Sequence, residues 1–374
     1  MAFLMESDVL FHISKSIAEN IANNVNYVES IDFVHSLIEA RKKGLILVSA
    51  HEMTLDIIFH HLAAQGNNRA AEIIRKIKIK QRQKKSLLKS LTKIIYVTGK
   101  TTKPRKLGNL LVVSCNSINK SNFLYPPYLL AENLSDCEFY STVIADNFFD
   151  DQCFDLSRLK THKSRYTGGG GNTISNQYDY YKNQGLDLCL CIADSDRKFP
   201  QDGLGDTAKF IVDSDAKNPS NYCEAIIINT YSIENILPIK ITEMEYIKDK
   251  GKDQIEEFSK IKKIYDDVSW KFLPLKKGVA GADLKSQTPY SNYWNGVLEK
   301  LKISTNCCSQ DKSNCNCKIV PSLSSKLLAS LLSNNTIDWR EALSNEENEH
   351  MRDTYRKIVL NVKSWLCTGE VMRS

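Results

Sequence analysis

The amino-acid sequence predicts an α/β protein whose central part, about residues 125–240, forms a parallel β-sheet flanked by helices. Three continuous apolar runs, Tyr128–Ala131, Leu186–Ala193 and Ala225–Ile228, are typical of strands buried on both faces. The stretches between the runs are long enough for the crossover helices that parallel strands require. The central part is therefore expected to alternate strands and helices.

The two flanking regions are expected to be rich in helix. Residues 1–120 are interpreted as a mostly helical N-terminal region with a basic helix over about 70–91 and a small hairpin of strands at 93–98 and 109–114. The spacing of Val9, Ile13, Ile17 and Ile21 predicts an earlier amphipathic helix. Residues 241–374 are interpreted as a mainly helical C-terminal region with a cysteine-rich insertion at 305–318.

Composition excludes several classes of protein. Of 374 residues, 42% are apolar and 25% charged, which is ordinary for a globular protein and excludes a largely disordered chain. No run of about 18 apolar residues occurs, so no membrane-spanning helix is expected. Residues 1–16 carry no basic segment before their apolar residues, and the eleven cysteines are an odd number. We therefore expect a cytoplasmic location with free thiols.

Positive charge is concentrated in one segment. Residues 71–106 contain 13 Lys and Arg residues and one acid, against 37 basic and 43 acidic residues elsewhere. At helical spacing this segment predicts one basic stripe, of which Lys78, Arg82 and Lys85 are candidate contacts to nucleic-acid phosphates. A merely solvated helix face is the alternative.

Acidic residues follow each of the three predicted strands. Glu132 follows the first, Asp194 and Asp196 follow the second, and Glu234 comes shortly after the third. Ligands of open parallel sheets bind beyond the carboxyl ends of the strands, and carboxylates there suit Mg²⁺ or Mn²⁺. The alternative interpretation is that these acids are turn and helix-capping residues.

The segments Leu-Leu-Ala-Glu132-Asn-Leu-Ser-Asp136, Ile-Ala-Asp194-Ser-Asp196 and Tyr-Ser-Ile-Glu234-Asn235 resemble the TOPRIM fold, over about a third of the chain. The closest likeness is to TOPRIM nucleases of bacterial phage-defence systems, including the overcoming-lysogenization-defect type. The resemblance implies a Rossmann-like parallel sheet. It also implies that Glu132 is a general acid/base or metal ligand, that Asp194 and Asp196 bind the metal, and that Asp136 supports the site.

Glu234 is a further candidate metal ligand. The sequence departs from the family pattern at Asn133, where the family usually has glycine.

The resemblance also implies a control partner. Gly99-Lys100-Thr101 lacks the earlier glycine of a phosphate-binding loop, because Ile94 stands in that position. A defence nuclease without its own ATP-binding loop is expected to depend on a separate ATPase or sensor protein.

Further candidate phosphate contacts surround the predicted strands. The run Gly168–Gly171 precedes a helical stretch, and glycine permits close approach of the backbone to an anion. The candidate residues, which include basic side chains near the run and after the Asp pair, are Lys163, Arg165, Gly169, Gly170, Arg197 and Lys198. A flexible loop without a ligand is the alternative for the glycines.

Four cysteines form a cluster among polar residues, namely Cys307, Cys308, Cys315 and Cys317. Four thiolates can hold a structural Zn²⁺, although the usual Cys-x2-Cys pairing is absent. Free thiols on a polar loop are the alternative.

These observations favour a Mg²⁺-dependent nuclease that cleaves phosphodiester bonds of DNA or RNA, including tRNA. Two other hypotheses remain open. One is a Mg²⁺-dependent phosphatase or nucleotide hydrolase that uses the Asp pair. The other is a non-catalytic nucleic-acid-binding scaffold whose acids are structural.

Overall fold

The computed structural model describes residues 10–83, 93–153, 156, 159–161, 165–170, 173–306, 315, 317–368 and 371–372. The chain divides into two compact units. The first contains residues 1–191, 214–225 and 356–374, and the second contains residues 192–213 and 226–355. The boundary falls within strands β9 (Cys189–Ala193) and β10 (Cys223–Ile227) and within helices α10 (Asp206–Lys217) and α17 (Glu349–Leu366). Residues of the predicted 125–240 segment therefore occur in both units.

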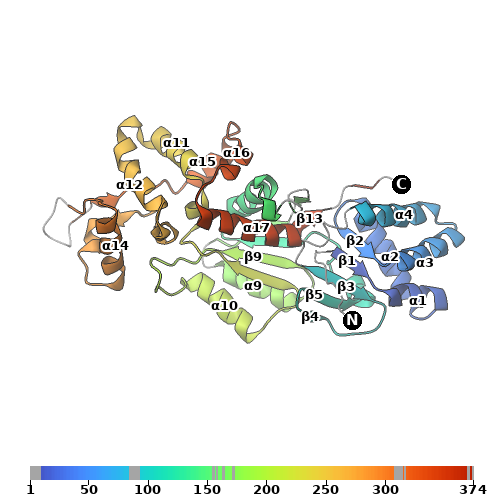
Figure 1. Ribbon diagram of the computed structural model, residues 1–374. Helices are drawn as coiled ribbons and strands as arrows, with labels where there is room; N and C mark the ends of the chain where they lie inside the picture. Colours follow the sequence, from blue (N-terminus) through green and yellow to red (C-terminus); the bar gives the residue numbers. More distant parts are fainter. Residues whose placement is uncertain are drawn as a thin grey trace. The chain divides into compact units, whose positions relative to one another are not determined.

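The first unit begins with a five-stranded sheet in the order β2-β1-β3-β5-β4. Its strands β1, β2, β3 and β5 run parallel, with Leu10 opposite both Leu47 and Ile94. Helices α1 to α4 surround β1, β2 and β3 (Figure 1). The bounds are β1 Leu10–Ile13, α1 Lys15–Asn23, α2 Tyr27–Lys42, β2 Leu47–Ala50, α3 Glu52–Ala64, α4 Asn68–Gln83, β3 Ile94–Thr98, β4 Arg105–Leu107, β5 Leu110–Ser114 and α6 Cys115–Asn119.

The helix expected from Val9 onward is wrong at its start. Ile13 ends strand β1, whereas Ile17 and Ile21 lie on helix α1, where both are buried. Val9 lies outside the described residues. Strand β1 pairs on both sides with β2 and β3, so sheet hydrogen bonding outweighs the local helical periodicity.

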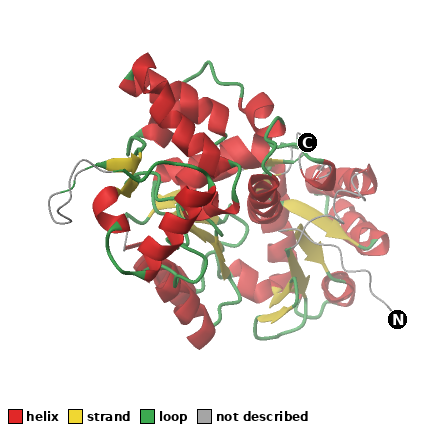
Figure 2. Ribbon diagram, turned by 60° about the vertical axis from the view of Figure 1, so that its left-hand side comes forward, coloured by secondary structure: helices red, strands yellow, loops and turns green. Residues whose placement is uncertain are grey.

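The two strands predicted near 93–98 and 109–114 are confirmed as β3 and β5. They do not form the expected hairpin with each other, because they are parallel. The hairpin partner of β5 is the short, exposed strand β4. The yellow strands of this sheet lie beside red helices in Figure 2.

The second sheet has the order β10-β9-β6-β8, and β6 runs parallel to both β8 and β9. The three apolar runs of the sequence form β6, β9 and β10, which confirms the α/β class. The bounds are β6 Tyr128–Ala131, α7 Leu134–Glu138, the π-helix η1 Phe139–Ala145, η2 Asp151–Cys153, β7 Lys160–Thr161, β8 Tyr166–Gly168, α9 Thr173–Gln184, β9 Cys189–Ala193, α10 Asp206–Lys217 and β10 Cys223–Ile227.

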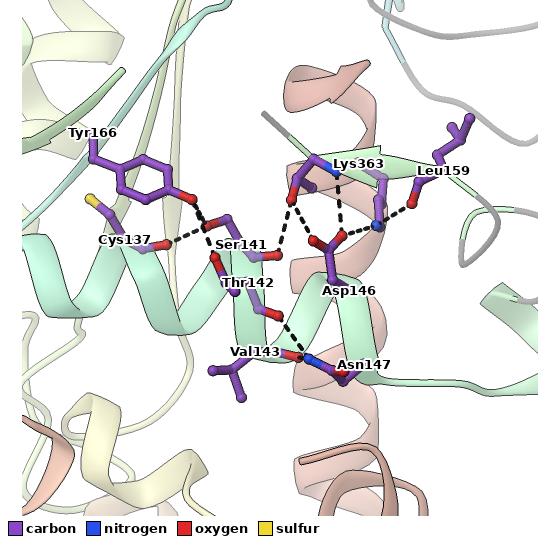
Figure 3. Close-up of polar contacts among 10 residues, drawn as sticks. Cys137, Ser141, Thr142, Val143, Asp146, Asn147, Leu159, Tyr166 and Lys363 are labelled. Carbon is purple, nitrogen blue, oxygen red and sulfur yellow. Dashed lines mark hydrogen bonds and ion pairs between the residues drawn. The ribbon is translucent and has the colours of Figure 1, made fainter. Parts of the chain in front are cut away.

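A buried ion pair fastens the end of the chain to the first unit (Figure 3). The Lys363 side chain on α17 is fully buried, and its ammonium donates to Asp146 Oδ1 and to the carbonyl of Leu159, both at 2.5 Å. Thr161 donates to the same carboxylate through its backbone N–H at 3.3 Å and its hydroxyl at 3.0 Å. Strand β13, Cys367–Thr368, then pairs with β7.

The second unit is mainly helical. Trp270 and Trp294 are buried in it, and Trp294 donates to the carbonyl of Lys198 at 3.0 Å. Among the described residues, no helix is both long and apolar enough to cross a membrane. The bounds are η3 Ile233–Ile236, α11 Ile239–Lys250, η4 Lys252–Gln254, α12 Ile255–Tyr265, η5 Val268–Phe272, β11 Val279–Ala280, α13 Gly281–Leu284, α14 Pro289–Lys300, β12 Lys318–Val320, α15 Leu327–Ser333, α16 Trp339–Ser344 and, shared with the first unit, α17 Glu349–Leu366.

Candidate acidic site

The Asp pair lies directly after β9 and is held by the segment that follows β10. The backbone N–H groups of Ser195 and Asp196 donate to the carbonyls of Thr230 and Tyr231, at 3.2 and 3.1 Å. The Ser195 hydroxyl adds a bond to Thr230 at 2.7 Å. Asp194 is buried, and its Oδ2 accepts the backbone N–H of Ile233 at 3.1 Å. Asp194 therefore already caps the short helix η3.

Asp196 occupies a conformation that few non-glycine residues adopt. Its φ is +53°, in the left-handed region. The loop also brings Gly205 against its side chain, and the Gly205 N–H donates to Ser195 O at 2.9 Å. A Cβ on Gly205 would lie 2.5 Å from Asp196 Cβ and 2.7 Å from Oδ2. The left-handed backbone of Asp196 and the lack of a side chain at Gly205 thus set where this carboxylate lies, at a cost in backbone strain.

Glu234 lies on η3 in the same unit and is almost completely buried. Its Oε1 forms an ion pair with Lys276 Nζ at 3.0 Å. Within the described part of the chain, its Oε2 is buried without a hydrogen-bond partner. The next residue, Asn235, donates to the carbonyls of Trp270 and Leu273, at 2.7 and 3.0 Å, which fixes η3 against η5.

The charges around Asp194, Asp196 and Glu234 shift the pKa values of neighbouring groups. Burial raises the pKa of the Asp196 carboxyl, while Lys276 and Lys277 oppose that shift. Burial also raises the pKa of the Tyr231 phenol, and the charges of Asp196, Asp194 and Glu234 raise it further. Asp194, Asp196 and Glu234, which the sequence predicted separately, therefore lie in one electrostatic environment, and Tyr231 stays protonated there.

The donor chemistry of these residues suits Mg²⁺ without forming a complete cage. Among the described residues, no group of three or more His, Cys, Asp or Glu side chains is arranged to hold a metal ion. Mg²⁺ usually needs only one or two protein carboxylates, because water and substrate phosphates complete its shell. The free, buried Oε2 of Glu234 is an oxygen donor of the required kind.

Glu132 and Asp136 belong to the first unit, so their role in the same centre as Asp194 stays a prediction. Glu132 follows β6 as expected, and its carbonyl accepts the N–H of Gly170 at 2.8 Å. Asp136 is buried, and its Oδ2 accepts the backbone N–H of Asn133 at 3.0 Å. Asn133 itself has an extended backbone, with φ −131° and ψ 161°, so this turn needs no glycine.

The glycine run has a clear structural use. A Cβ on Gly169 would collide with the backbone of Ile174 at the start of α9, and Gly170 has a φ of +61°. The Gly169 N–H also donates to the carbonyl of Ala131 at 2.9 Å. These contacts explain the glycines through packing and turn formation, and a phosphate contact at Gly169 and Gly170 stays a prediction.

Several basic candidates are engaged by acids of the first unit. Lys78 forms an ion pair with Asp56 at 2.6 Å, and Arg82 pairs with Glu52. Arg165 pairs with Asp187 at 2.6 Å and lies over the ring of Tyr128. The basic stripe is therefore partly neutralised, and the guanidinium of Arg165 has a structural role. Lys85 and Lys163 lie outside the described residues.

The remaining basic candidates, Arg197 and Lys198, directly follow the Asp pair. Lys198 is exposed, and its charge opposes the raised pKa of Asp196. Within the described chain, Arg197 Nε is buried without a hydrogen-bond partner. Of the predicted phosphate contacts, these two stand nearest to the acidic residues along the chain.

The cysteine cluster does not offer four thiolates. Cys315 is disulfide-bonded and so is no thiolate ligand, which also corrects the expectation that it is free. Cys317 is partly buried, and the buried Cys189, Cys191 and Cys223 are free thiols. Cys307 and Cys308 lie outside the described residues.

The sequence analysis did not identify three residues of this site, namely Gly205, Tyr231 and Lys276. Tyr231 stood within the quoted Tyr-Ser-Ile-Glu-Asn motif, which could have signalled it. Nothing in the pattern around Gly205 or Lys276 distinguishes them from ordinary loop residues.

Comparison with known proteins identifies no relative of this chain: no family model matches it, and neither a curated protein nor a solved structure is significantly similar to it.

Proposed function

We propose that the chain is a metal-dependent nuclease whose centre contains Asp194, Asp196 and Glu234. The observation that carries this proposal is the buried Oε2 of Glu234, which has no hydrogen-bond partner among the described residues and lies on the short helix η3 that Asp194 caps. A strained Asp196 and an unsatisfied Glu234 together cost folding free energy, on the order of a few kcal/mol. Because these features destabilise the fold, we infer that they are kept for a function and not for stability.

The residues divide the chemistry among them. Asp194 and Asp196 would hold Mg²⁺, with Glu234 as a further candidate ligand, and the bound ion would neutralise phosphate charge and make water a better nucleophile. Lys276, Lys277 and Lys198 favour an anionic phosphate beside Asp196. The protonated Tyr231 hydroxyl can donate to a phosphate oxygen. A water or ribose hydroxyl then forms the new P–O bond, its proton passes to a base, and the bridging oxygen leaves.

The resemblance to TOPRIM nucleases supports two finer proposals. Glu132 would act as the base or as a further ligand, and the protein would act in phage defence under the control of a separate ATPase or sensor. The isolated chain should then cleave slowly, and a protein partner should copurify with it from its native host. Full activity of the isolated chain, with no copurifying partner, would contradict control by a partner.

The test is cleavage of plasmid DNA and bulk tRNA by the purified chain in Mg²⁺ or Mn²⁺ against EDTA. Asp194→Ala should abolish metal-dependent products and retain the wild-type circular dichroism spectrum. Asp253→Ala, which removes an exposed acid of the same unit, should cleave like the wild type. Retained cleavage in Asp194→Ala would refute the site assignment.

A non-catalytic scaffold is the second candidate, because the Lys276–Glu234 ion pair and the cap on η3 also give these acids structural roles. It predicts nucleic-acid binding that falls with salt but is indifferent to Mg²⁺ and to Asp194→Ala. Hydrolysis of mononucleotides with no action on polymers would instead favour a phosphatase or nucleotide hydrolase.

A further inference from the structure

A large open groove lies in the second unit, formed by residues of α11, α12, α16, the start of α17 and the segments that join them. Its volume is about 870 Å³. Its residues come from three stretches of chain, 238–268, 336–342 and 345–350, and none of them belongs to the acidic site above. The groove is thus a separate feature of the molecule.

Its lining is strongly acidic. Seven carboxylate residues face two lysines, a formal excess of five negative charges: Asp266, Asp267, Asp338, Glu341, Glu346, Glu347 and Glu349 against Lys240 and Lys262, with His350 beside them. Lys262 is already paired with Glu243 at 2.8 Å, outside the lining, and Asp267 is paired with Lys300. The groove therefore attracts cations.

Apolar side chains stand among these charges. Met244 is 65% exposed and Val268 is 50% exposed, and both line the groove. Ile239, Ile241 and Ile337 add further apolar surface. Exposed apolar side chains rimmed by charges mark an interaction surface.

A buried carboxylate forms a fixed part of the lining. Glu346 is only 6% exposed, and its Oε1 accepts the Tyr265 hydroxyl and the backbone N–H of Asn348, the latter at 2.9 Å. Burial raises the pKa of the Glu346 carboxyl, against the hydrogen bonds that lower it. Asn348 also donates to the carbonyl of Tyr265 at 2.8 Å, so the end of α12 is tied to the segment that immediately precedes α17. These hydrogen bonds therefore hold this part of the groove lining in place.

We propose that this groove binds a basic amphipathic segment of a partner protein, with lysines or arginines on the carboxylates and apolar side chains on Met244 and Val268. The charge of the lining fits such a segment and repels nucleic acid. A small-molecule site would bury most of its ligand, whereas here the apolar anchors and the acidic rim are open to solvent. The inference does not depend on the proposed nuclease activity.

The experiment measures binding of a fluorescein-labelled peptide to the full chain by fluorescence anisotropy. The probe is a lysine–leucine peptide of about 14 residues with its leucines on one helical face. The double variant Glu341→Gln, Glu347→Gln should weaken binding about tenfold. Met244→Ser should weaken it about fivefold, because an apolar anchor is lost.

Three controls make the result specific. Glu256→Gln with Glu299→Gln removes two exposed charges of the same unit outside the groove and should change binding less than about twofold. Ile255→Ser, an apolar residue that is 50% exposed elsewhere, should act likewise. A scrambled peptide of equal charge should bind more weakly.

Three results would overturn the proposal. One is equal loss of binding in the groove and control variants, which would mean non-specific attraction. Another is unchanged binding in the groove variants. The last is preferential binding of spermine over the peptide, which would make the groove a polyamine site. None of these measurements involves cleavage, so a failure of the groove proposal can be distinguished from a failure of the nuclease proposal.

Discussion

Two acidic clusters of this protein, one around Asp146 and one formed by Asp194, Asp196 and Glu234, use similar residues in opposite ways. In the first unit, Asp146 accepts from Lys363 and from both donors of Thr161, and the Lys363 ammonium also reaches the carbonyl of Leu159 (Figure 3). In the second unit, Glu234 pairs with Lys276, while its buried Oε2 has no hydrogen-bond partner among the described residues, and Asp196 has a strained backbone.

The difference lies in how completely the polar groups are satisfied. A buried carboxylate whose donors all come from neighbouring elements ties those elements together. A buried carboxylate oxygen without a hydrogen-bond partner destabilises the fold, and it gains a favourable interaction only when a ligand binds. The Asp146 cluster is therefore interpreted as structural and the Asp194–Asp196–Glu234 cluster as functional, and the following changes test that contrast.

The largest expected effect comes from Lys363→Met. It leaves Asp146, whose side chain is 26% exposed, without its counter-ion, so the free energy of unfolding should fall by about 3 kcal/mol, measured by urea denaturation. The double variant Asp146→Asn, Lys363→Met should recover much of that loss. Equal stability of the wild type and Lys363→Met would contradict the structural role of the pair.

Gly205→Ala should come next. Its Cβ would meet Asp196, so stability should fall by about 1–3 kcal/mol and metal-dependent cleavage should be lost. The matched control is Gly203→Ala, because a Cβ there meets nothing within 4 Å. Active, stable Gly205→Ala protein would show that Asp196 does not need this placement.

The pH dependence of the free energy of unfolding should report on the Lys363–Asp146 pair. Burial lowers the pKa of Lys363, with Asp146 opposing, so the unfolded chain binds more protons between that lowered pKa and about 10.5. Within this window stability should rise with pH, by at most about 1.4 kcal/mol per pH unit, and below it the contribution is constant. Urea titrations of the wild type should show this rise relative to Lys363→Met. A parallel pH profile of the two proteins would contradict it.

The smallest effect is expected from Asp196→Gly. Glycine adopts a φ of +53° without strain, so stability should rise by about 0.5–1 kcal/mol while cleavage disappears. Asp196→Asn, which tolerates this conformation, should keep stability near the wild type and also lose cleavage. A clear loss of stability in both variants would assign Asp196 to the structural class.

Local composition predicted the elements whose pattern is decided within a few residues. Continuous apolar runs identified β6 and β9 because strands covered on both faces need no polar side chains. The run at β10 identified a strand that is only partly buried. Periodicity misassigned Leu10–Ile13, because two neighbouring strands decide that segment. The acids at the ends of the strands were found from the same runs, since position relative to a strand is a local property.

The chain by itself therefore determined the α/β class, the main strands and which acids stand at their ends. Tertiary structure alone decided which charges meet: Lys276 with Glu234, Lys78 with Asp56 and Lys363 with Asp146. The physical reason is that strand and helix signals arise from neighbours in sequence, whereas burial and ion pairing depend on residues 22 to 217 positions apart.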